Sequence, residues 1–296
     1  MNILLIGCGL TGGAIASNLL KLPIVKEVAL YSRTVKSAKA LAFDLNNSKV
    51  KVIEKLDKLS DFDYVVIALS GMSDSAREDS IFKRKTTFEV RQDELKYNIG
   101  AITGLVSYLK QISNKTKIIV ITNPVDEITN YLRIILKNGR VFGFGLDLDA
   151  RRYSKILGKQ IFCIGTHGKA IPLIHSSSEL DYDTLYKKTD TELMSYIRRN
   201  GIPHNLAGEA FANFFYKFVS KKEEILHICY YLKKEFLGVK DISISLPFIV
   251  KNGKILRIVD LSINKIEKKR FGRLAEQLKK SVKHILATHK ELISYK

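Results

Sequence analysis

The sequence predicts an α/β protein in which a doubly wound parallel sheet is followed by an α+β domain. Short apolar runs alternate with segments of helical apolar spacing through the first half of the chain, as in a parallel sheet covered by helices on both faces. A glycine-rich turn directly follows the first run, and the alternation ends at about residue 145. We therefore expect one domain over residues 1–142 and a second over residues 143–296.

The elements of the first half follow from the spacing of their apolar residues. Short aliphatic and β-branched runs predict strands at residues 2–7, 27–32, 49–54, 63–69, 116–122 and 140–145. Apolar residues three and four positions apart predict helices at residues 12–22, 35–45, 89–112 and 125–136. No low-complexity linker interrupts this order, so we expect a continuous domain.

The second half mixes strands and helices without regular alternation. Residues 162–168 have the composition of a strand, and residues 190–235 have mostly helical spacing. Residues 242–261 predict two strands around Asn252-Gly253, because Asn-Gly is a preferred two-residue hairpin turn. Residues 266–286 predict a final amphipathic helix.

The composition is typical of a globular protein. The chain has 296 residues, of which 46% are hydrophobic, which is enough to bury a sizeable core. No apolar run is long enough to span a membrane and no signal peptide is evident, so we expect a cytoplasmic protein. The three cysteines suggest neither a disulfide framework nor a metal site. The net charge of +19 favours a solvated basic surface that attracts anionic ligands over a nucleic-acid partner.

A glycine-rich turn opens the chain. Gly7, Gly9 and Gly12 form the pattern G-x-G-x-x-G between the first predicted strand and the first predicted helix, which is the context of a dinucleotide-binding Rossmann turn. Such glycines let backbone N–H groups approach a pyrophosphate at the helix N-terminus. We expect this turn, with Leu10 and Thr11, to bind a dinucleotide; a glycine-rich turn without a ligand is the alternative.

The end of the second predicted strand bears on cofactor choice. Dinucleotide-binding domains usually carry an acidic ribose ligand about 20 residues after the glycines, and this chain has Ser32 there, followed by Arg33. A carboxylate would repel a 2′-phosphate, whereas a hydroxyl and a guanidinium would bind one. Lys36 and Lys39 add positive charge. The sequence therefore favours NADP(H), with NAD(H) possible if Arg33 only stacks on the adenine.

Four further stretches carry a family resemblance. They are VRQDELKYN at residues 90–98, ITNPVD at 121–126, GFGLDLDARRY at 143–153 and IGTHGKAIPL at 164–173. In this order, and with the glycine-rich turn, the chain resembles the lactate/malate dehydrogenase family over nearly its whole length. The resemblance implies hydride transfer between a nicotinamide cofactor and a small L-2-hydroxy acid, in a homo-oligomer that is a dimer or a tetramer.

The resemblance also implies catalytic roles. His167 is the expected proton donor and acceptor, and Asp149 is the carboxylate paired with its imidazole. Arg152 holds the substrate carboxylate, for which a planar two-pronged cation is suited. Arg91 polarises the substrate carbonyl when its loop closes. For each residue alone, a turn, cap or surface role is an alternative.

Three other positions complete the expected site. Asn123 contacts substrate and nicotinamide, while Asn98 and Ile121 belong to the cofactor site. The loop at residues 70–90, which precedes Arg91, is longer than usual in the family. Lys85 lies six positions before Arg91, where malate enzymes of the family carry an arginine for the second carboxylate.

The substrate is less well defined by the sequence. A cation at Lys85 slightly favours malate and oxaloacetate over lactate, and a bulkier 2-hydroxy acid comes third. A solvated basic loop is the competing interpretation of the same residues. A basic NADP-binding module without efficient catalysis is the alternative from another class of protein.

Overall fold

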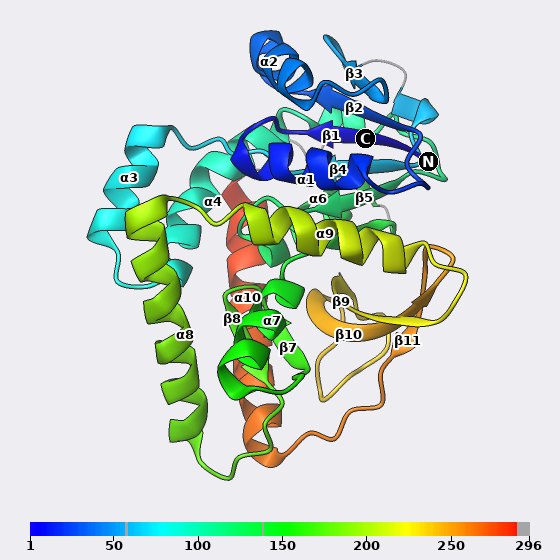
Figure 1. Ribbon diagram of the computed structural model, residues 1–296. Coiled ribbons are helices and arrows are strands. Elements are labelled where there is room, and N and C mark those ends of the chain that lie inside the picture. The colour runs from blue at the N-terminus through cyan, green and yellow to red at the C-terminus, as the bar shows by residue number, and fades with distance from the viewer. Residues whose placement is uncertain (57–58, 138, 289–296) are drawn as a thin grey trace.

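A computed structural model describes residues 1–56, 59–137 and 139–288 (Figure 1). The strands are β1 (Asn2–Ile6), β2 (Glu27–Tyr31), β3 (Val50–Val52), β4 (Tyr64–Ile67), β5 (Lys117–Val120), β6 (Val141–Gly143), β7 (Cys163–Thr166), β8 (Lys169–Pro172), β9 (Glu224–Tyr231), β10 (Ser243–Lys251) and β11 (Lys254–Ile258). The helices are α1 (Leu10–Leu20), α2 (Val35–Leu45), α3 (Asp74–Lys83), α4 (Thr87–Thr103), α5 (Val106–Leu109), α6 (Val125–Leu136), α7 (Leu146–Leu157), α8 (Glu179–Asn200), α9 (Asn205–Phe218) and α10 (Lys265–Thr288), with a 3-10 turn η1 (Leu59–Asp61).

The first half forms the predicted doubly wound sheet. The strands run in the order β3-β2-β1-β4-β5-β6, and every pair in this series is parallel. All six predicted strands of this half are confirmed. The chain order reverses between β1 and β4, and ligands of such sheets bind at the carboxyl ends of the strands at this switch point.

Alternate residues of the central strands face two different cores. Ile3 and Leu5 of β1 pack with α1 and α9 on one face, and Leu4 and Ile6 pack with α4 and α6 on the other. Figure 1 shows α1 and α9 side by side across the near face of the sheet. A strand buried on both faces reads as a continuous apolar run, which explains why these strands could be found from the sequence.

The sheet continues into the second half of the chain. β6 pairs antiparallel with β9 through Gly143 and Cys229, and β9, β10, β7 and β8 follow, with β11 beside β10. The predicted hairpin is confirmed, because β10 and β11 pair antiparallel and Asn252 and Gly253 both have positive φ, at 52° and 69°. The predicted final helix is confirmed as α10.

Three stretches differ from the prediction. The expectation of mostly helical structure at residues 190–235 is correct for α8 and α9 but wrong for β9, which pairs with β10 over its whole length. Leu226, His227, Ile228 and Cys229 are all buried there, so the strand is covered on both faces and shows no alternation of buried and exposed residues. The long predicted helix ends at Gly104, and a separate short helix, α5, follows. The loop before α4 contains a helix, α3, that the sequence analysis did not predict.

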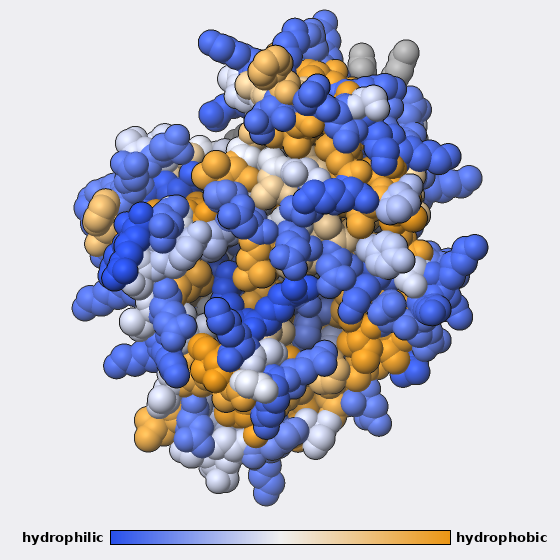
Figure 2. Space-filling model, viewed as in Figure 1, coloured by the Kyte–Doolittle hydropathy of each residue, from blue (hydrophilic) through white to orange (hydrophobic). Residues whose placement is uncertain are grey.

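The face shown in Figure 2 is mostly hydrophilic, with apolar residues exposed in small separate groups. Within the described ranges, no helix is long and apolar enough to cross a membrane.

The contact between α1 and α9 joins the two halves of the chain next to the glycine-rich turn, from which α1 begins. A Cβ at Gly208 on α9 would lie 2.6 Å from the backbone of Ala14 on α1. The two helices can therefore approach this closely only because position 208 has no side chain. Since α1 begins at the glycine-rich turn, this contact also fixes the position of that turn.

We predict that Gly208→Ala lowers the free energy of unfolding by about 1–3 kcal/mol, the usual effect of overpacking a core. Gly272→Ala is the matched control, because a Cβ at this helical glycine on α10 meets nothing within 4 Å. The control should raise stability by about 0.5–1 kcal/mol, since Ala is the better helix former. Urea denaturation measures both variants; equal stability of Gly208→Ala and wild type would contradict the close contact.

Candidate active site

A cleft of about 1940 Å³ lies at the carboxyl ends of the parallel strands. The predicted site residues that line it are Gly7, Gly9, Leu10, Thr11, Ser32, Arg33, Arg91, Asn98, Ile121, Asn123, Arg152 and His167. Gly12 and Asp149 are buried directly behind this lining, and Lys85 lies outside it. The structure therefore brings together nearly all of the predicted residues, although they come from both halves of the chain.

The glycine-rich turn can accept the backbone of a dinucleotide. Gly7 has a φ of +114°, and a Cβ there would lie 2.5 Å from the carbonyl oxygen of Ala68. A Cβ at Gly12 would overlap the carbonyl oxygen of Gly7. The first backbone bond of α1 runs from Gly13 N–H to the carbonyl oxygen of Gly9, so the preceding N–H groups have no helical acceptor. They are available to a pyrophosphate at the positive end of the helix.

The end of β2 gives the cleft a cationic side. Ser32 and Arg33 line it, and α2 begins two residues later without an acidic residue in its first turn. Lys39 forms an ion pair with Glu54 at 2.8 Å and does not belong to the lining. Of the predicted cations in this region, Arg33 is the one placed at the cleft.

His167 and Asp149 form a buried pair. Nδ1 of His167 lies 2.7 Å from Oδ2 of Asp149, and the same carboxylate accepts hydrogen bonds from Gly168 N–H at 3.1 Å and from Arg152 Nη1 at 3.4 Å. An ionised carboxylate only accepts hydrogen bonds, so the proton lies on Nδ1. The other ring nitrogen, Nε2, is then free to exchange a proton with a ligand in the cleft that His167 lines.

The electrostatics of this pair keep the carboxylate charged. Burial by itself would raise the pKa of Asp149, but the attraction of His167, Arg152 and Arg91 outweighs it and brings the pKa to about 2. Burial lowers the pKa of His167 below its usual 6.5, Asp149 opposes this shift, and Arg91 adds to it. The imidazole is therefore neutral at pH 7 and gains a proton only at a cost that Asp149 reduces.

A second buried carboxylate holds the turn that carries His167. Asp126, at the start of α6, accepts the backbone N–H of His167 at 2.8 Å and the hydroxyl of Ser245 at 2.8 Å. Burial raises the pKa of Asp126 to about 6. On the other side, the ring of His167 packs on Gly145, where a Cβ would lie 2.7 Å from Cγ of the ring. Sequence reasoning quoted Asp126 within ITNPVD but did not assign it this role.

Arg91 lies beside the same turn. Its guanidinium contacts the backbone of Gly168 so closely that a Cβ at Gly168, which has a φ of +89°, would overlap Nη1. Nη1 also donates to the hydroxyl of Thr87 at 3.3 Å. Arg91 is buried in α4, and Arg152 extends from α7 on the other side of Asp149. Two guanidinium groups and an imidazole thus converge on one end of the cleft.

Asn98 and Asn123 connect this end of the cleft with the cofactor turn. Nδ2 of Asn98 donates to the backbone oxygen of Asn123 at 2.7 Å, and Oδ1 of Asn98 accepts from Gly71 N–H at 2.7 Å. Oδ1 of Asn123 is buried and has no hydrogen-bond partner among the described residues. A buried acceptor without a partner is unfavourable, and here it lies in the cleft, where a ligand can supply the donor.

Five charged residues that line the cleft were not assigned to it from the sequence, namely Asp44, Asp74, Arg77, Glu78 and Glu94. Arg77 on α3 and Glu94 on α4 line it, with Arg77 Nε 3.7 Å from Oε1 of Glu94. Burial raises the pKa of Glu94 against the opposing effects of Arg77 and Arg91. The signal for α3 was available, because Ser73 caps this helix by accepting from Ala76 N–H.

The structure does not bring Lys85 to the cleft. Lys85 is exposed between α3 and α4, and its backbone N–H donates to Glu89 at 3.0 Å. Its neighbours in the basic run form ion pairs away from the cleft, Lys83 with Asp79 at 2.8 Å and Arg84 with Asp93 at 2.7 Å. This arrangement corresponds to the solvated basic loop that was the competing interpretation.

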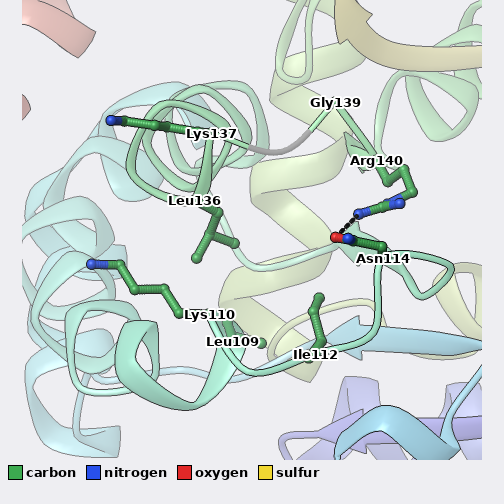
Figure 3. A pocket seen from close by; sticks show the side chains of 8 residues that line it. All are labelled: Leu109, Lys110, Ile112, Asn114, Leu136, Lys137, Gly139 and Arg140. Carbon is green, nitrogen blue, oxygen red and sulfur yellow. Dashed lines mark hydrogen bonds between the residues drawn. The ribbon is translucent and has the colours of Figure 1, made fainter. Parts of the chain in front are cut away.

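A smaller pocket of about 340 Å³ lies elsewhere on the first half of the chain. Its lining is Leu109, Lys110, Ile112, Asn114, Leu136, Lys137, Gly139 and Arg140. Figure 3 shows Arg140 directed toward Asn114, with Nη2 3.4 Å from Oδ1. The lining has neither an imidazole nor a carboxylate, so it offers no acid–base chemistry of the kind seen in the large cleft.

An imidazole oriented by a carboxylate, beside two arginines and a glycine-rich turn, is the arrangement expected of a dehydrogenase that moves a proton and a hydride to or from one substrate. The model of the lactate/malate dehydrogenase NAD binding domain matches residues 1–143, and the model of the alpha/beta C-terminal domain of these enzymes matches residues 162–289. The chain belongs to the lactate/malate dehydrogenase family. It is a nicotinamide-dependent dehydrogenase that acts on the CH–OH group of 2-hydroxy acids.

Relatives and solved structures agree with this assignment. An L-2-hydroxycarboxylate dehydrogenase (NAD(P)(+)) of Methanocaldococcus jannaschii is 27% identical, with 95% of this chain and 97% of the relative covered. A malate dehydrogenase of Methanosphaera stadtmanae is 25% identical, with 92% of this chain and 93% of the relative covered. The structure of a malate dehydrogenase from Plasmodium falciparum has a TM-score of 0.81 at 17% identity, with 99% of this chain and 100% of the solved chain covered. The last comparison confirms the fold.

We predict that His167→Ala lowers turnover by roughly 10²–10⁴-fold, the usual contribution of general acid–base catalysis, and leaves cofactor affinity nearly unchanged. Reduction of an oxo acid needs the protonated imidazole. The wild-type kcat/KM for reduction should therefore fall as pH rises through a pKa that burial holds below 6.5, and the variant should lose this dependence.

The matched control is His175→Ala, because the side chain of His175 is 51% exposed and faces Glu267. It should leave both turnover and the pH profile unchanged. Near-wild-type turnover of His167→Ala would show that another group carries the proton.

Proposed function

We propose that this enzyme interconverts small 2-oxo acids and L-2-hydroxy acids, with NADP(H) favoured as cofactor, NAD(H) possible, and oxaloacetate and malate slightly favoured as substrates. The observation that carries the proposal is the His167–Asp149 pair between Arg91 and Arg152 in the dinucleotide cleft. The L configuration follows the family resemblance.

The residues divide the chemistry between them. When bound, the nicotinamide supplies or accepts the hydride at C2 of the substrate. The Arg152 guanidinium holds the C1 carboxylate, because its paired donors match the two carboxylate oxygens. Arg91 donates to the C2 oxygen as negative charge develops there, which is a large effect in a site with little water. Nε2 of His167 gives its proton to that oxygen, and Asp149 stabilises the imidazolium beforehand.

The cofactor preference is supported by the end of β2. Ser32 and Arg33 line the cleft where a ribose-binding carboxylate would discriminate against a 2′-phosphate. The positive end of α2, whose first turn has no acidic residue, lies next in the chain and favours an anion. The M. jannaschii relative is described as an NAD(P)(+) enzyme, which is compatible with use of both cofactors.

We expect the wild-type enzyme to use NADPH with a higher kcat/KM than NADH. Arg33→Ala should weaken NADPH binding by about 1.5–3 kcal/mol, the contribution of a hydrogen bond to a charged group, and should change NADH binding little. Lys39→Ala is the matched control, because its ammonium group is paired with Glu54. Fluorescence titration gives the dissociation constants; a clear NADH preference of the wild type would contradict the proposal.

The substrate preference is supported by Arg77, a fourth arginine of the cleft besides Arg33, Arg91 and Arg152. Arg77 faces the cleft, and its Nε is buried without a hydrogen-bond partner among the described residues. Burial raises the pKa of the adjacent Glu94, which lowers the negative charge available to compensate Arg77. Nη1 of Arg77 is paired with Asp74 at 3.3 Å and Nη2 donates to the hydroxyl of Ser70, so Nε is the donor left for a second substrate carboxylate, which a monocarboxylate does not have.

We predict that oxaloacetate is reduced faster than pyruvate at equal low concentration, and that Arg77→Gln lowers kcat/KM for oxaloacetate by roughly tenfold or more, as expected for a lost charged hydrogen bond. Lys85→Gln is the control and should change nothing, since Lys85 is exposed outside the cleft. If Lys85→Gln lowered the ratio of kcat/KM for oxaloacetate to kcat/KM for pyruvate and Arg77→Gln did not, Lys85 would be the residue that binds the second carboxylate. Equal or better use of pyruvate by the wild type would favour lactate or a larger 2-hydroxy acid.

A further inference from the structure

Arg91 is connected by hydrogen bonds to a carboxylate on α8. Its Nη1 donates to Oγ1 of Thr87 at 3.3 Å. The hydroxyl of Thr87 donates in turn to Oδ1 of Asp190 at 2.5 Å, and the backbone N–H of Thr87 donates to the same oxygen at 3.0 Å. The three residues therefore form a short chain that runs from α8 through the first residue of α4 to the guanidinium at the catalytic end of the cleft.

All three residues are buried, with exposed fractions of 7% for Asp190, 4% for Thr87 and 8% for Arg91. A buried carboxylate is unfavourable unless hydrogen bonds and positive charge compensate it. Both hydrogen bonds that Asp190 accepts within the described residues come from Thr87. The N-terminus of a helix of 17 residues supplies further positive potential. The carboxylate of Asp190 is thus directed entirely at the start of α4.

The packing around this chain makes α8 the support of the segment that bears Arg91. Ile81 of α3, Val90 of α4 and Met194 of α8 form a small apolar core. Arg198 of α8 donates to the backbone oxygen of Arg84 at 3.0 Å, between α3 and α4. Figure 1 shows α8 running past α3 and α4 on the same side of the molecule.

On its other side, Arg91 touches the turn that carries the proton donor. The guanidinium lies on the backbone of Gly168, next to His167, and the ammonium group of Lys169 lies 3.7 Å from the ring centre of Phe88 on α4. A shift of the first turn of α4 would therefore change the position of Arg91 relative to His167. A misplacement of about 1 Å in such a site can lower the rate by about 10²-fold.

We propose that Asp190 is a positioning residue for catalysis, acting through Thr87 to hold the Arg91 guanidinium against Gly168 and beside His167. The inference rests on the proposed role of Arg91 toward the C2 oxygen. Asp190 itself touches neither substrate nor cofactor, and its effect is confined to the step in which Arg91 stabilises developing charge. Its loss should accordingly lower kcat, with little change in the affinity for NADPH.

The test compares Asp190→Asn with Glu192→Gln, an exposed carboxylate two positions further along α8. Asp190→Asn keeps the shape of the side chain and one oxygen that can accept from Thr87, but it replaces two charge-assisted hydrogen bonds by neutral ones, and should lower kcat for oxo-acid reduction by roughly five- to tenfold. NADPH affinity and the unfolding midpoint should remain near those of the wild type. Glu192→Gln should behave like the wild type in all three measurements. A folded Asp190→Asn enzyme with wild-type kcat would overturn the proposal.

Two variants of Thr87 provide an independent route if Asp190→Asn does not fold. Thr87→Val removes the hydroxyl that joins Asp190 to Arg91, while Thr87→Ser retains it. The proposal requires a kcat loss in Thr87→Val and a return toward the wild-type kcat in Thr87→Ser. Equal kcat values for the two variants would contradict it.

Arg91→Gln separates the positioning proposal from the proposed function. If Arg91→Gln had the wild-type kcat, the role of Arg91, and with it the proposed mechanism, would fail. If Arg91→Gln lowers kcat, the double variant Asp190→Asn/Arg91→Gln should be only slightly slower than Arg91→Gln alone, because both changes act on one group. Losses that multiply fully would show that Asp190 acts by another path, and would overturn the positioning role alone.

Discussion

The buried hydrogen bond between His167 and Asp149 is the interaction on which the rest of the site depends. A carboxylate in this position is stable only because an imidazole, a backbone N–H group and the guanidinium of Arg152 surround it. The same charge orients the ring and fixes Nδ1 as its donor, so that Nε2 faces the cleft. If Asp149 lost its charge, the proton on His167 would have neither a defined position nor a nearby counter-ion.

Several layers of the fold serve to keep this pair in place. Asp149 lies on α7, and His167 lies in the tight turn between β7 and β8. Asp126 holds the backbone of that turn from α6, which belongs to the first half of the chain. Gly145 and Gly168 allow the ring and a guanidinium to approach the backbone closely. Each of these contacts restricts the position of His167, Asp149 or Arg91 relative to the other two.

The distribution of charge around the cleft follows from the ligands of a 2-hydroxy acid dehydrogenase. A nicotinamide dinucleotide and a carboxylic acid are both anionic, and the cleft offers them a helix N-terminus and four arginines, Arg33, Arg77, Arg91 and Arg152, beside the carboxylates of Asp44, Asp74, Glu78 and Glu94. The net charge of +19 adds a long-range field of the same sign, which raises the local concentration of anions. Glu94 and Asp190 reduce this excess inside the protein, where unpaired arginines would be unfavourable.

The sequence by itself determined the parallel sheet and the glycine-rich turn, and it predicted His167, Asp149, Arg91 and Arg152, which the fold brings together. Strands buried on both faces appear as continuous apolar runs, and the glycines are required by local backbone geometry, so both leave a local signal. The motif around His167 could be identified by its resemblance to a known family. The tertiary structure alone decided which charged residues reach the cleft, because that depends on how separate elements pack. Lys85 is next to α4 in sequence but is exposed to solvent, whereas Arg77 reaches Glu94 and Asp190 reaches Thr87 only because α3 and α8 fold against α4. β9 was missed for the same reason, since a strand between β6 and β10 is stabilised by neighbours that are distant in the sequence.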